Sequence, residues 1–209
     1  MELIDIVLIL VGFSLLESIS KKKNKEKMTG GGNSKATENI YNEPLVSCKE
    51  GTMSNGSWDG EGKCSELGGG VHQICIKNIS KNTPSFSKST GQSNWSDQRG
   101  RDNHCVCLGA WSLYNAKGKS NNKKKLKCDA IPKDSLSINY VNKFRQGWNV
   151  WNGLELENQI VDGVEALIEE CYDKNSNSVK HENLKNNYCN LSNQVNALRN
   201  RPKYNEICI

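Results

Sequence analysis

The sequence predicts an α+β protein: a small domain rich in cysteine and glycine with a short sheet, an N-terminal hydrophobic anchor helix, and a C-terminal antiparallel helical hairpin. Three observations favour this class. A long apolar run opens the chain, nine cysteines and clustered glycines accompany short apolar runs in the middle, and helical spacing of apolar residues returns near the end. With 35% hydrophobic residues and a mean hydropathy of −0.68, the 209 residues supply only a modest core.

Residues 1–20 are predicted to form the membrane anchor. A bilayer span needs about 20 apolar residues, so the shorter uninterrupted run from Ile6 to Leu16 leaves a signal peptide and a buried core helix as alternatives. Acidic residues precede the run and lysines follow it, which favours an uncleaved anchor with the rest of the chain on the cytosolic side. The predicted anchor side chains are Ile6, Val7, Leu8, Ile9, Leu10, Val11, Phe13, Leu15 and Leu16.

Residues 21–41 are expected to form a basic collar and a flexible linker. The net charge is +5, with lysines gathered in residues 21–27 and again in residues 123–127. Lysine runs attract phosphate or anionic lipid. These two runs lack the interleaved arginine and aromatic residues typical of nucleic-acid sites, so we expect solvated loops and no nucleic-acid partner.

Residues 42–136 are predicted to be the cysteine-rich domain. Residues 71–76, "VHQICI", and residues 104–111, "HCVCLGAW", have strand-like patterns, and residues 125–131 form a weaker strand candidate. A strand through residues 104–111 would direct Cys105 and Cys107 to the same face of the sheet.

The cysteines admit three interpretations. His72, Cys75, Cys105 and Cys107 are residue types that bind zinc, although the usual Cys-x-x-Cys spacing is missing. A thiol enzyme would need such a motif at a helix N-terminus, or a histidine oriented beside the thiol. The interpretation adopted is structural, with disulfides or buried thiols, no catalytic residue, no metal and no cofactor. The structural cysteines are Cys48, Cys64, Cys75, Cys105, Cys107, Cys128, Cys171 and Cys189, and their spacing does not give the pairing.

An ordered set of motifs in this region resembles a family of small bacterial and viral proteins, domain of unknown function 2237. The matching elements are Leu45 with Cys48, residues 55–60 leading to Cys64, Gly70 to Cys75, Phe86-Ser87 leading to Gly91, and Asp102 to Trp111. Residues 92–94 and 130–132 depart from the family's Asn-Asp-Leu and Ala-Thr-His. The resemblance covers residues 42–136 and implies no known reaction, cofactor or catalytic residue.

The C-terminal third is predicted to be helical. Residues 137–153 form an aromatic connector, whose stripe of Tyr140, Phe144, Trp148 and Trp151 is either a packed face or a partner-binding patch. Residues 154–201 form the hairpin, with two apolar seams, Leu156, Ile160, Val164, Leu167 and Cys171, then Leu184, Tyr188, Leu191, Val195 and Leu198.

Two cysteine predictions follow from the hairpin. Cys171 and Cys189 are about equally far from its turn, which predicts a cross-link between the two helices. Cys208, in the tail of residues 202–209, is predicted to be free or intermolecular.

Composition and resemblance together indicate a large DNA virus as the source. We expect a non-enzymatic minor capsid protein of the virion, positioned between inner membrane and capsid shell, whose partners are membrane lipid and other capsid proteins rather than a small-molecule substrate. The alternatives are a small enzyme or zinc-binding domain of unknown reaction, and a secreted disulfide-rich module.

Overall fold

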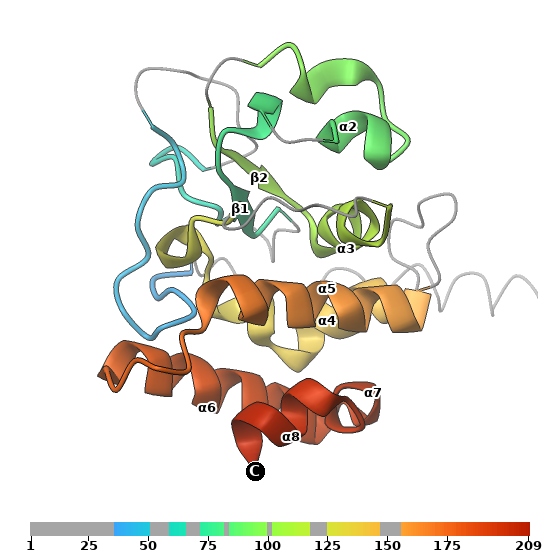
Figure 1. Ribbon diagram of the computed structural model, residues 1–209. Helices are drawn as coiled ribbons and strands as arrows, with labels where there is room; N and C mark the ends of the chain where they lie inside the picture. Colours follow the sequence, from blue (N-terminus) through green and yellow to red (C-terminus); the bar gives the residue numbers. More distant parts are fainter. Residues whose placement is uncertain are drawn as a thin grey trace, which may run out of the picture. The chain divides into compact units, whose positions relative to one another are not determined.

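Two short antiparallel strands lie at the centre of the cysteine-rich region. The computed structural model describes residues 36–50, 59–65, 72–81, 84–99, 102–117, 125–146 and 156–209, which fall in one compact unit, Ser34–Ile209. Strands β1 (Ile74–Ile76) and β2 (His104–Val106) pair so that Cys75 faces Cys105. All six strand residues are buried. The predicted mixture of helices with a small antiparallel sheet is confirmed at this level (Figure 1).

The third predicted strand, residues 125–131, is wrong. Leu126 makes a single bridge to Ile76, and the chain then turns into the 3-10 helix η4 (Cys128–Ala130). Further short elements surround the sheet: η2 (Ile79–Lys81), α2 (Phe86–Ser89) and η3 (Asn94–Ser96). The sheet therefore positions its cysteines among loops and single helical turns rather than in a larger sheet.

Strand β2 is shorter than predicted because a helix begins immediately after it. The strand ends at Val106, opposite Ile74, where its partner strand begins. Cys107 then accepts the Trp111 N–H with its carbonyl oxygen at 3.0 Å and the Ala110 N–H with its sulfur at 3.4 Å, and α3 runs over Leu108–Lys117. The expectation that Cys105 and Cys107 belong to one strand is therefore wrong.

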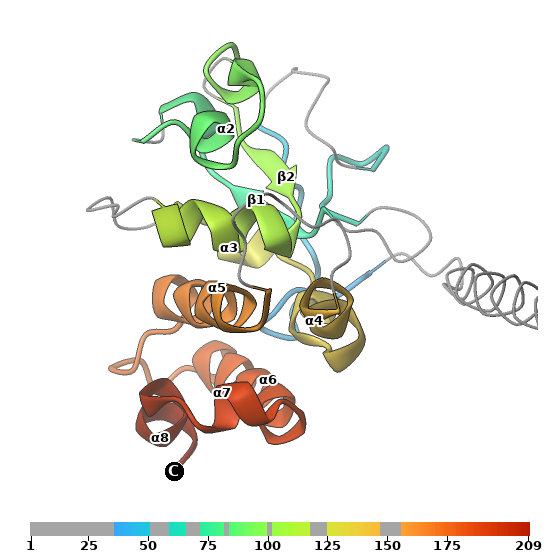
Figure 2. The ribbon, with the colours of Figure 1, turned by 90° about the vertical axis from the view of Figure 1, so that its right-hand side faces the viewer.

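The helical layers lie on one side of the cysteine-rich region (Figures 1 and 2). After η5 (Lys133–Leu136), α4 (Ile138–Arg145) begins at Ser137, whose hydroxyl accepts the Tyr140 N–H. Helix α5 (Leu156–Cys171) packs against α3, and the indole N–H of Trp111 donates to the Gly163 carbonyl oxygen at 2.9 Å. The predicted helical region is thus packed directly on the cysteine-rich region.

The second seam belongs to α6 (Val179–Gln194) and the elements after it. The seam residues are buried in both predicted helices, apart from Leu156, whose side chain lies outside the description. The second helix does not continue to the end of its seam. It stops before Val195, and α7 (Asn196–Arg199) and α8 (Pro202–Cys208) follow. The expected tail, residues 202–209, is therefore mostly helix, with Pro202 at the first helical position.

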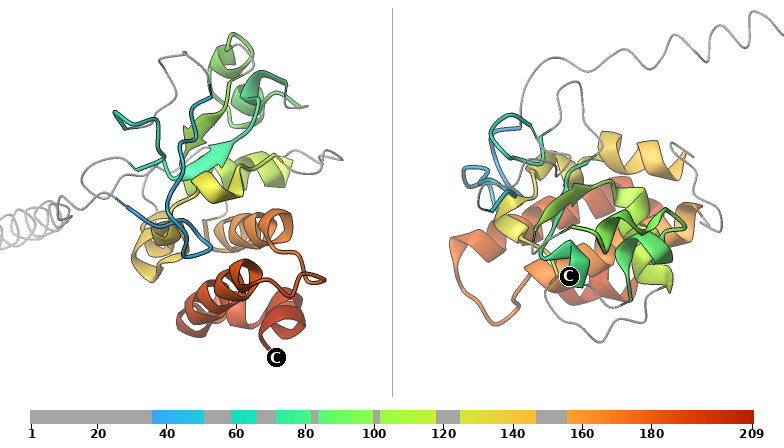
Figure 3. Two further views of the ribbon diagram at one scale, coloured as in Figure 1. Left: turned by 90° about the vertical axis from the view of Figure 1, so that its left-hand side faces the viewer. Right: turned by 90° about the horizontal axis from the view of Figure 1, so that it is seen from above.

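The predicted flexible linker extends too far along the chain. Ile40 and Tyr41 are buried, and the Ile40 N–H donates to the carbonyl oxygen of Ile131 at 2.9 Å. Asn183 and Asn187, on α6, donate side-chain N–H groups to the carbonyl oxygens of Tyr41 and Ile40. Figure 3 shows this segment, in blue, beside the yellow residues of η4 and η5. Residues 36–41 of the predicted linker belong to the packed unit, and residues 21–35 lie outside the described residues.

The predicted anchor side chains, Ile6 to Leu16, also lie outside the described residues. Across the ranges that the structure does describe, none of the helices has the length and apolar character needed to span a bilayer.

Candidate functional site

Four disulfides organise the described part of the chain: Cys48–Cys75, Cys64–Cys105, Cys128–Cys171 and Cys189–Cys208. The prediction that the cysteines form disulfides is confirmed. The predicted Cys171–Cys189 cross-link is wrong, because the last turn of α5 faces η4, where Cys128 lies. Cys208 is bonded rather than free, because α8 folds back onto α6 and brings it to Cys189.

Two of these disulfides are adjacent and fully buried. Cys75 and Cys105 face each other across β1 and β2, and their partners Cys48 and Cys64 come from loops. The sulfur atoms of Cys48, Cys64 and Cys105 all lie within 4.8 Å of one another. All four cysteines have zero exposure, so solvent does not reach these sulfur atoms in the folded protein.

Three residues of the alternative zinc set lie around a small cavity of about 210 Å³. His72, Cys105 and Cys107 line it, together with His104, but Cys75 does not. Cys75 is bonded to Cys48 and Cys105 to Cys64, so the alternative zinc set of His72, Cys75, Cys105 and Cys107 does not hold as a set in this structure. Two candidate ligands, His72 and Cys107, nevertheless meet at one hollow.

Aromatic and cationic groups form the rest of this cavity. The Trp95 ring stacks at a tilt on His104, with 4.7 Å between centroids, and the Arg99 guanidinium lies 5.5 Å from the Trp95 centroid. The indole N–H of Trp95 donates to Gln92 at 2.9 Å. Burial, followed by the nearby charges of Arg99 and His72, lowers the pKa of His104 to about 3. His104 is therefore neutral at physiological pH, since protonation would place a second cation beside Arg99 without water.

Cys107 is the one described cysteine outside the four disulfides, and it is 2% exposed. It immediately precedes α3, and the N–H of Ala110, in the first turn of that helix, donates to its sulfur. Donated hydrogen bonds and a helix N-terminus both favour negative charge on sulfur. A thiol, two imidazoles and a guanidinium around one cavity are the residue types of nucleophilic thiol chemistry, while the burial of Cys107 and the low pKa of His104 oppose that use.

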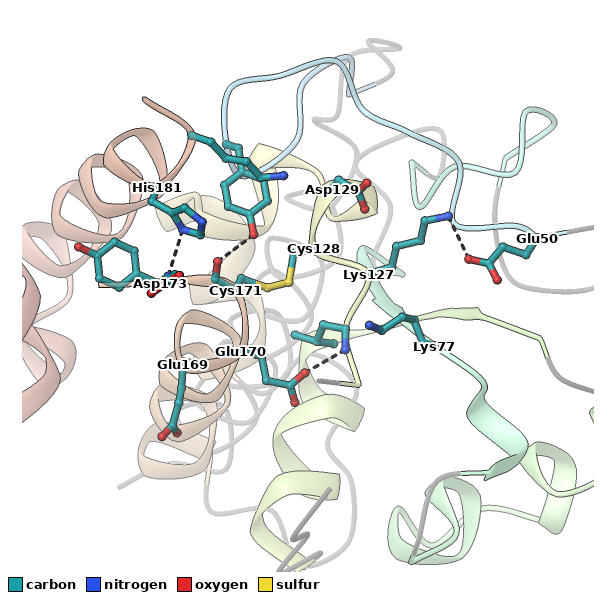
Figure 4. A pocket seen from close by; sticks show the side chains of 14 residues that line it. Glu50, Lys77, Lys127, Cys128, Asp129, Glu169, Glu170, Cys171, Asp173 and His181 are labelled. Carbon is teal, nitrogen blue, oxygen red and sulfur yellow. Dashed lines mark hydrogen bonds and ion pairs between the residues drawn. A yellow bond between two sulfur atoms is a disulfide. The ribbon is translucent and has the colours of Figure 1, made fainter. Parts of the chain in front are cut away.

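A larger pocket, of about 750 Å³, surrounds the Cys128–Cys171 disulfide and was missed at the sequence level. Its lining joins η4 and the adjacent chain to the end of α5 and the start of α6 (Figure 4). Both acidic and basic side chains line it: Glu50, Lys77, Lys127, Asp129, Glu169, Glu170, Asp173, Lys180 and His181. No sequence motif links these positions, because they come from segments far apart in the chain.

Several charged groups of this pocket already bind within the protein. Lys127 pairs with Glu50 at 3.2 Å, and the Lys180 ammonium lies 4.1 Å from the Tyr41 ring centroid. Glu170 accepts the backbone N–H groups of Lys125 and Leu126 at 2.6 and 2.9 Å. Burial raises the pKa of Glu170, and these two hydrogen bonds oppose the shift. The pocket is therefore a polar contact region between η4 and the helices α5 and α6.

Lys125 departs from the prediction that residues 123–127 form a solvated loop. Its side chain is 5% exposed, and its ammonium donates to the Tyr114 hydroxyl at 2.9 Å. Burial lowers the pKa of Lys125, while the charge of Glu170 opposes that shift. The other part of the lysine run, residues 123–124, lies outside the described residues.

Of the two alternatives for the aromatic stripe, the packed face is confirmed for Tyr140 and Phe144, and the partner-binding patch is wrong for these two residues. Tyr140 and Phe144 are 3% and 0% exposed, and the Tyr140 hydroxyl accepts the Leu108 N–H at 3.2 Å. They form the packed face of α4, so they offer no surface to a partner. Trp148 and Trp151 lie outside the described residues.

Comparison with family models, with curated proteins and with solved structures finds no match to this chain.

Proposed function

We propose that this chain is a non-enzymatic structural protein, a minor capsid protein of a large DNA virus. Its N-terminal apolar segment holds it in the inner membrane, and its folded part links that membrane to the shell or joins neighbouring capsomers. The observation that carries the proposal is the use of eight of the nine cysteines in four disulfides.

The disulfides support a bracing role because they connect separate elements of the fold. Cys128–Cys171 joins η4 to α5, and Cys189–Cys208 joins α6 to α8. Closing loops of these lengths stabilises a fold by about 3–4 kcal/mol each. A chain with a modest apolar content gains in this way the rigidity that a permanent assembly component needs.

The charge order around the apolar segment supports the membrane location. Acidic residues precede the segment and five lysines follow it within residues 21–27. This order keeps the folded part on the cytosolic face, which becomes the outer face of an internal virion membrane. The resemblance to domain of unknown function 2237 and the lysine-rich composition support a viral source and form part of the same proposal.

The membrane half of the proposal is tested by carbonate extraction of cells that express the full chain. The parent chain is expected in the carbonate-resistant pellet, and the double variant Leu10→Asp/Val11→Asp in the supernatant, since two charges at the centre of the run prevent insertion. Met28→Asp adds a charge outside the run and serves as the matched control, which stays in the pellet. A parent chain found in the supernatant would refute membrane anchoring.

The capsid half is tested on purified particles. Averaged cryo-electron microscopy density is expected at repeated positions beneath the shell. Cross-linking mass spectrometry is expected to join Lys133 or Lys174, whose side chains are 44% and 70% exposed, to other capsid proteins. A chain present only in soluble extract of infected cells, and absent from particles, would refute the capsid role.

The cavity that His72, His104 and Cys107 share favours a second candidate, a small thiol enzyme. The two candidates differ in the reactivity of Cys107. A scaffold thiol that is 2% exposed reacts with iodoacetamide only after unfolding, whereas a catalytic thiol reacts in the native state. Native labelling of Cys107 within minutes, abolished by the variant His72→Ala, would favour the enzyme over the structural protein.

A further inference from the structure

We propose that Cys48, Cys64, Cys75 and Cys105 form a tetrathiolate site for one zinc ion whenever their two disulfides are reduced. The buried pair of disulfides and the zinc site are then two states of the same four residues. The inference is independent of the proposed function, because it concerns neither the membrane nor the capsid.

The positions of the sulfur atoms carry the proposal. In a tetrahedral site with zinc–sulfur bonds of about 2.3 Å, neighbouring sulfur atoms are about 3.8 Å apart. The sulfur atoms of Cys48, Cys64 and Cys105 already lie within 4.8 Å of one another. The Cys75 sulfur is bonded to that of Cys48 but lies farther than 4.8 Å from at least one of the other two, so the Cys75 side chain must rotate toward them to complete a tetrahedron.

The backbone holds these cysteines together without help from the disulfides. Cys75 and Cys105 face each other in the β1–β2 ladder. The Cys48 N–H donates to the Gly62 carbonyl oxygen at 2.9 Å, which fastens the loop of Cys48 to the loop that leads to Cys64. The Asn103 side chain, next to β2, donates to the Cys48 carbonyl oxygen at 2.8 Å. Reduction leaves these hydrogen bonds in place, so the four thiols stay near one another.

The surroundings select the metal. All four cysteines are fully buried, as in closed structural sites that lack a water ligand. Among the described residues, no histidine or carboxylate joins the cluster within 4.8 Å. A set of four sulfur ligands binds zinc and other thiophilic ions and disfavours magnesium or calcium, which take oxygen ligands.

The exchange between the two states balances with a monothiol of the glutathione class. Four such thiols reduce the two disulfides, which yields four cysteine thiols and two disulfides of the reductant. One Zn²⁺ then binds the four thiolates as four protons leave. Transfer of the electrons back to two disulfides of the glutathione class restores both protein disulfides and releases the ion.

The other cysteines are expected to bind no zinc. Cys128–Cys171 and Cys189–Cys208 form separate pairs, and across the described ranges no further group of three cysteine, histidine, aspartate or glutamate ligand atoms lies this close together. Cys107 lines the neighbouring cavity but does not belong to the cluster. The expected stoichiometry is therefore one zinc ion per chain.

The test uses the full chain, reduced in denaturant and refolded with reductant and zinc, then desalted and measured by elemental analysis. About one zinc ion per chain is expected for the reduced parent, and none for the oxidised parent with its four disulfides. Cys48→Ser and Cys105→Ser are expected to lose the ion. Cys107→Ser and Cys189→Ser are matched controls that keep it. A reduced parent without zinc would overturn the proposal.

Cobalt substitution of the reduced parent keeps the test decisive if a variant fails to fold. Four sulfur ligands are expected to give strong sulfur-to-cobalt charge-transfer absorption and the visible bands of a tetrahedral ion. A spectrum of mixed nitrogen and sulfur ligation, lost in His72→Ala and Cys107→Ser, would overturn the proposal by placing the ion in the neighbouring cavity.

Discussion

Gly163→Ala tests whether the helical layer is fixed to the cysteine-rich region by close contact of α3 and α5. An added Cβ at Gly163 would lie 2.8 Å from the Cβ and 3.0 Å from the Cα of Ser112, and it would overlap the Ser112 hydroxyl. The neighbouring hydrogen bond from Trp111 to the Gly163 carbonyl oxygen fixes the two helices at this separation. The helices must therefore move apart to accept one methyl group.

Two opposing effects set the change in the free energy of unfolding that Gly163→Ala causes. Alanine in place of glycine in a helix interior stabilises by about 1 kcal/mol. Overpacking of a tightly packed contact costs about 1–3 kcal/mol, and the Cα of Ser112 belongs to backbone that cannot rotate away, which places the cost at the upper end of that range. We expect Gly163→Ala to lower the free energy of unfolding by about 1–2 kcal/mol.

Urea denaturation followed by circular dichroism measures this change, at a constant slope of free energy against urea. The double variant Ser112→Gly/Gly163→Ala is the control, because it removes the Cβ and hydroxyl that the new methyl meets. The double variant should lose less free energy of unfolding than Ser112→Gly and Gly163→Ala lose together, by at least about 1 kcal/mol. A single variant Gly163→Ala as stable as the parent would refute close packing of α3 on α5.

Three further predictions concern the site and its supports. Cys128→Ser/Cys171→Ser opens a loop with a sequence separation of 43, so urea denaturation under oxidising conditions should show a loss of about 4 kcal/mol, and an unchanged midpoint would contradict the bond. The pKa of His104 falls to about 3 on folding, so the folded state excludes a proton that the unfolded state binds below pH 6.5. The oxidised protein should therefore lose about 2 kcal/mol between pH 7.5 and pH 5, a slope that His104→Gln should remove in the same titration. Asn39 is 1% exposed, accepts the Tyr41 N–H at 2.9 Å and donates to the Asp129 carbonyl oxygen at 3.1 Å. Asn39→Ala should cost about 2–3 kcal/mol in thermal or urea unfolding, while the exposed Asn190→Ala should stay close to the parent.

The helices were predictable because their signal is local. The spacing of Ile160, Val164 and Leu167 repeats every three or four residues, and such a repeat specifies one buried face whatever that face contacts. The same reasoning placed the seam of α6. It failed at Val195, where the chain leaves the helix, because the seam continues in register into α7 while the backbone does not.

The predicted strand of residues 104–111 was too long, because the pattern of its second half does not distinguish a strand from a helix. Cys107 to Trp111 satisfies strand alternation and helical spacing equally well. The choice between them depends on the partner strand, which pairs no further than Val106. Beyond that point the backbone N–H groups have no strand to bind, and hydrogen bonds to the carbonyl and sulfur of Cys107 begin a helix instead.

The sequence predicted only some of the residues that form the candidate sites. Cys75 and Cys105 were named in the zinc interpretation that was set aside for a structural one, because both lie in strand-like segments that contain cysteine, and the structure places both in disulfides. Their neighbours Cys48 and Cys64 were not chosen, since they come from glycine-rich loops whose path no periodicity describes. The polar pocket around Cys128–Cys171 had no sequence signal at all, because its lining combines segments more than 100 residues apart, such as Tyr41 and His181.

The sequence by itself determined that residues 154–201 hold two helices with buried seams, that the middle of the chain depends on cysteine, and where an apolar segment precedes the folded part. These properties follow from the order and spacing of neighbouring residues. Only the tertiary structure decided which sulfur atoms meet, that Tyr140 and Phe144 face the core, and that Lys125 is buried. Each of these depends on residues distant in the chain, because a disulfide or a buried contact requires two groups to approach in space, and spacing along the sequence does not specify that approach.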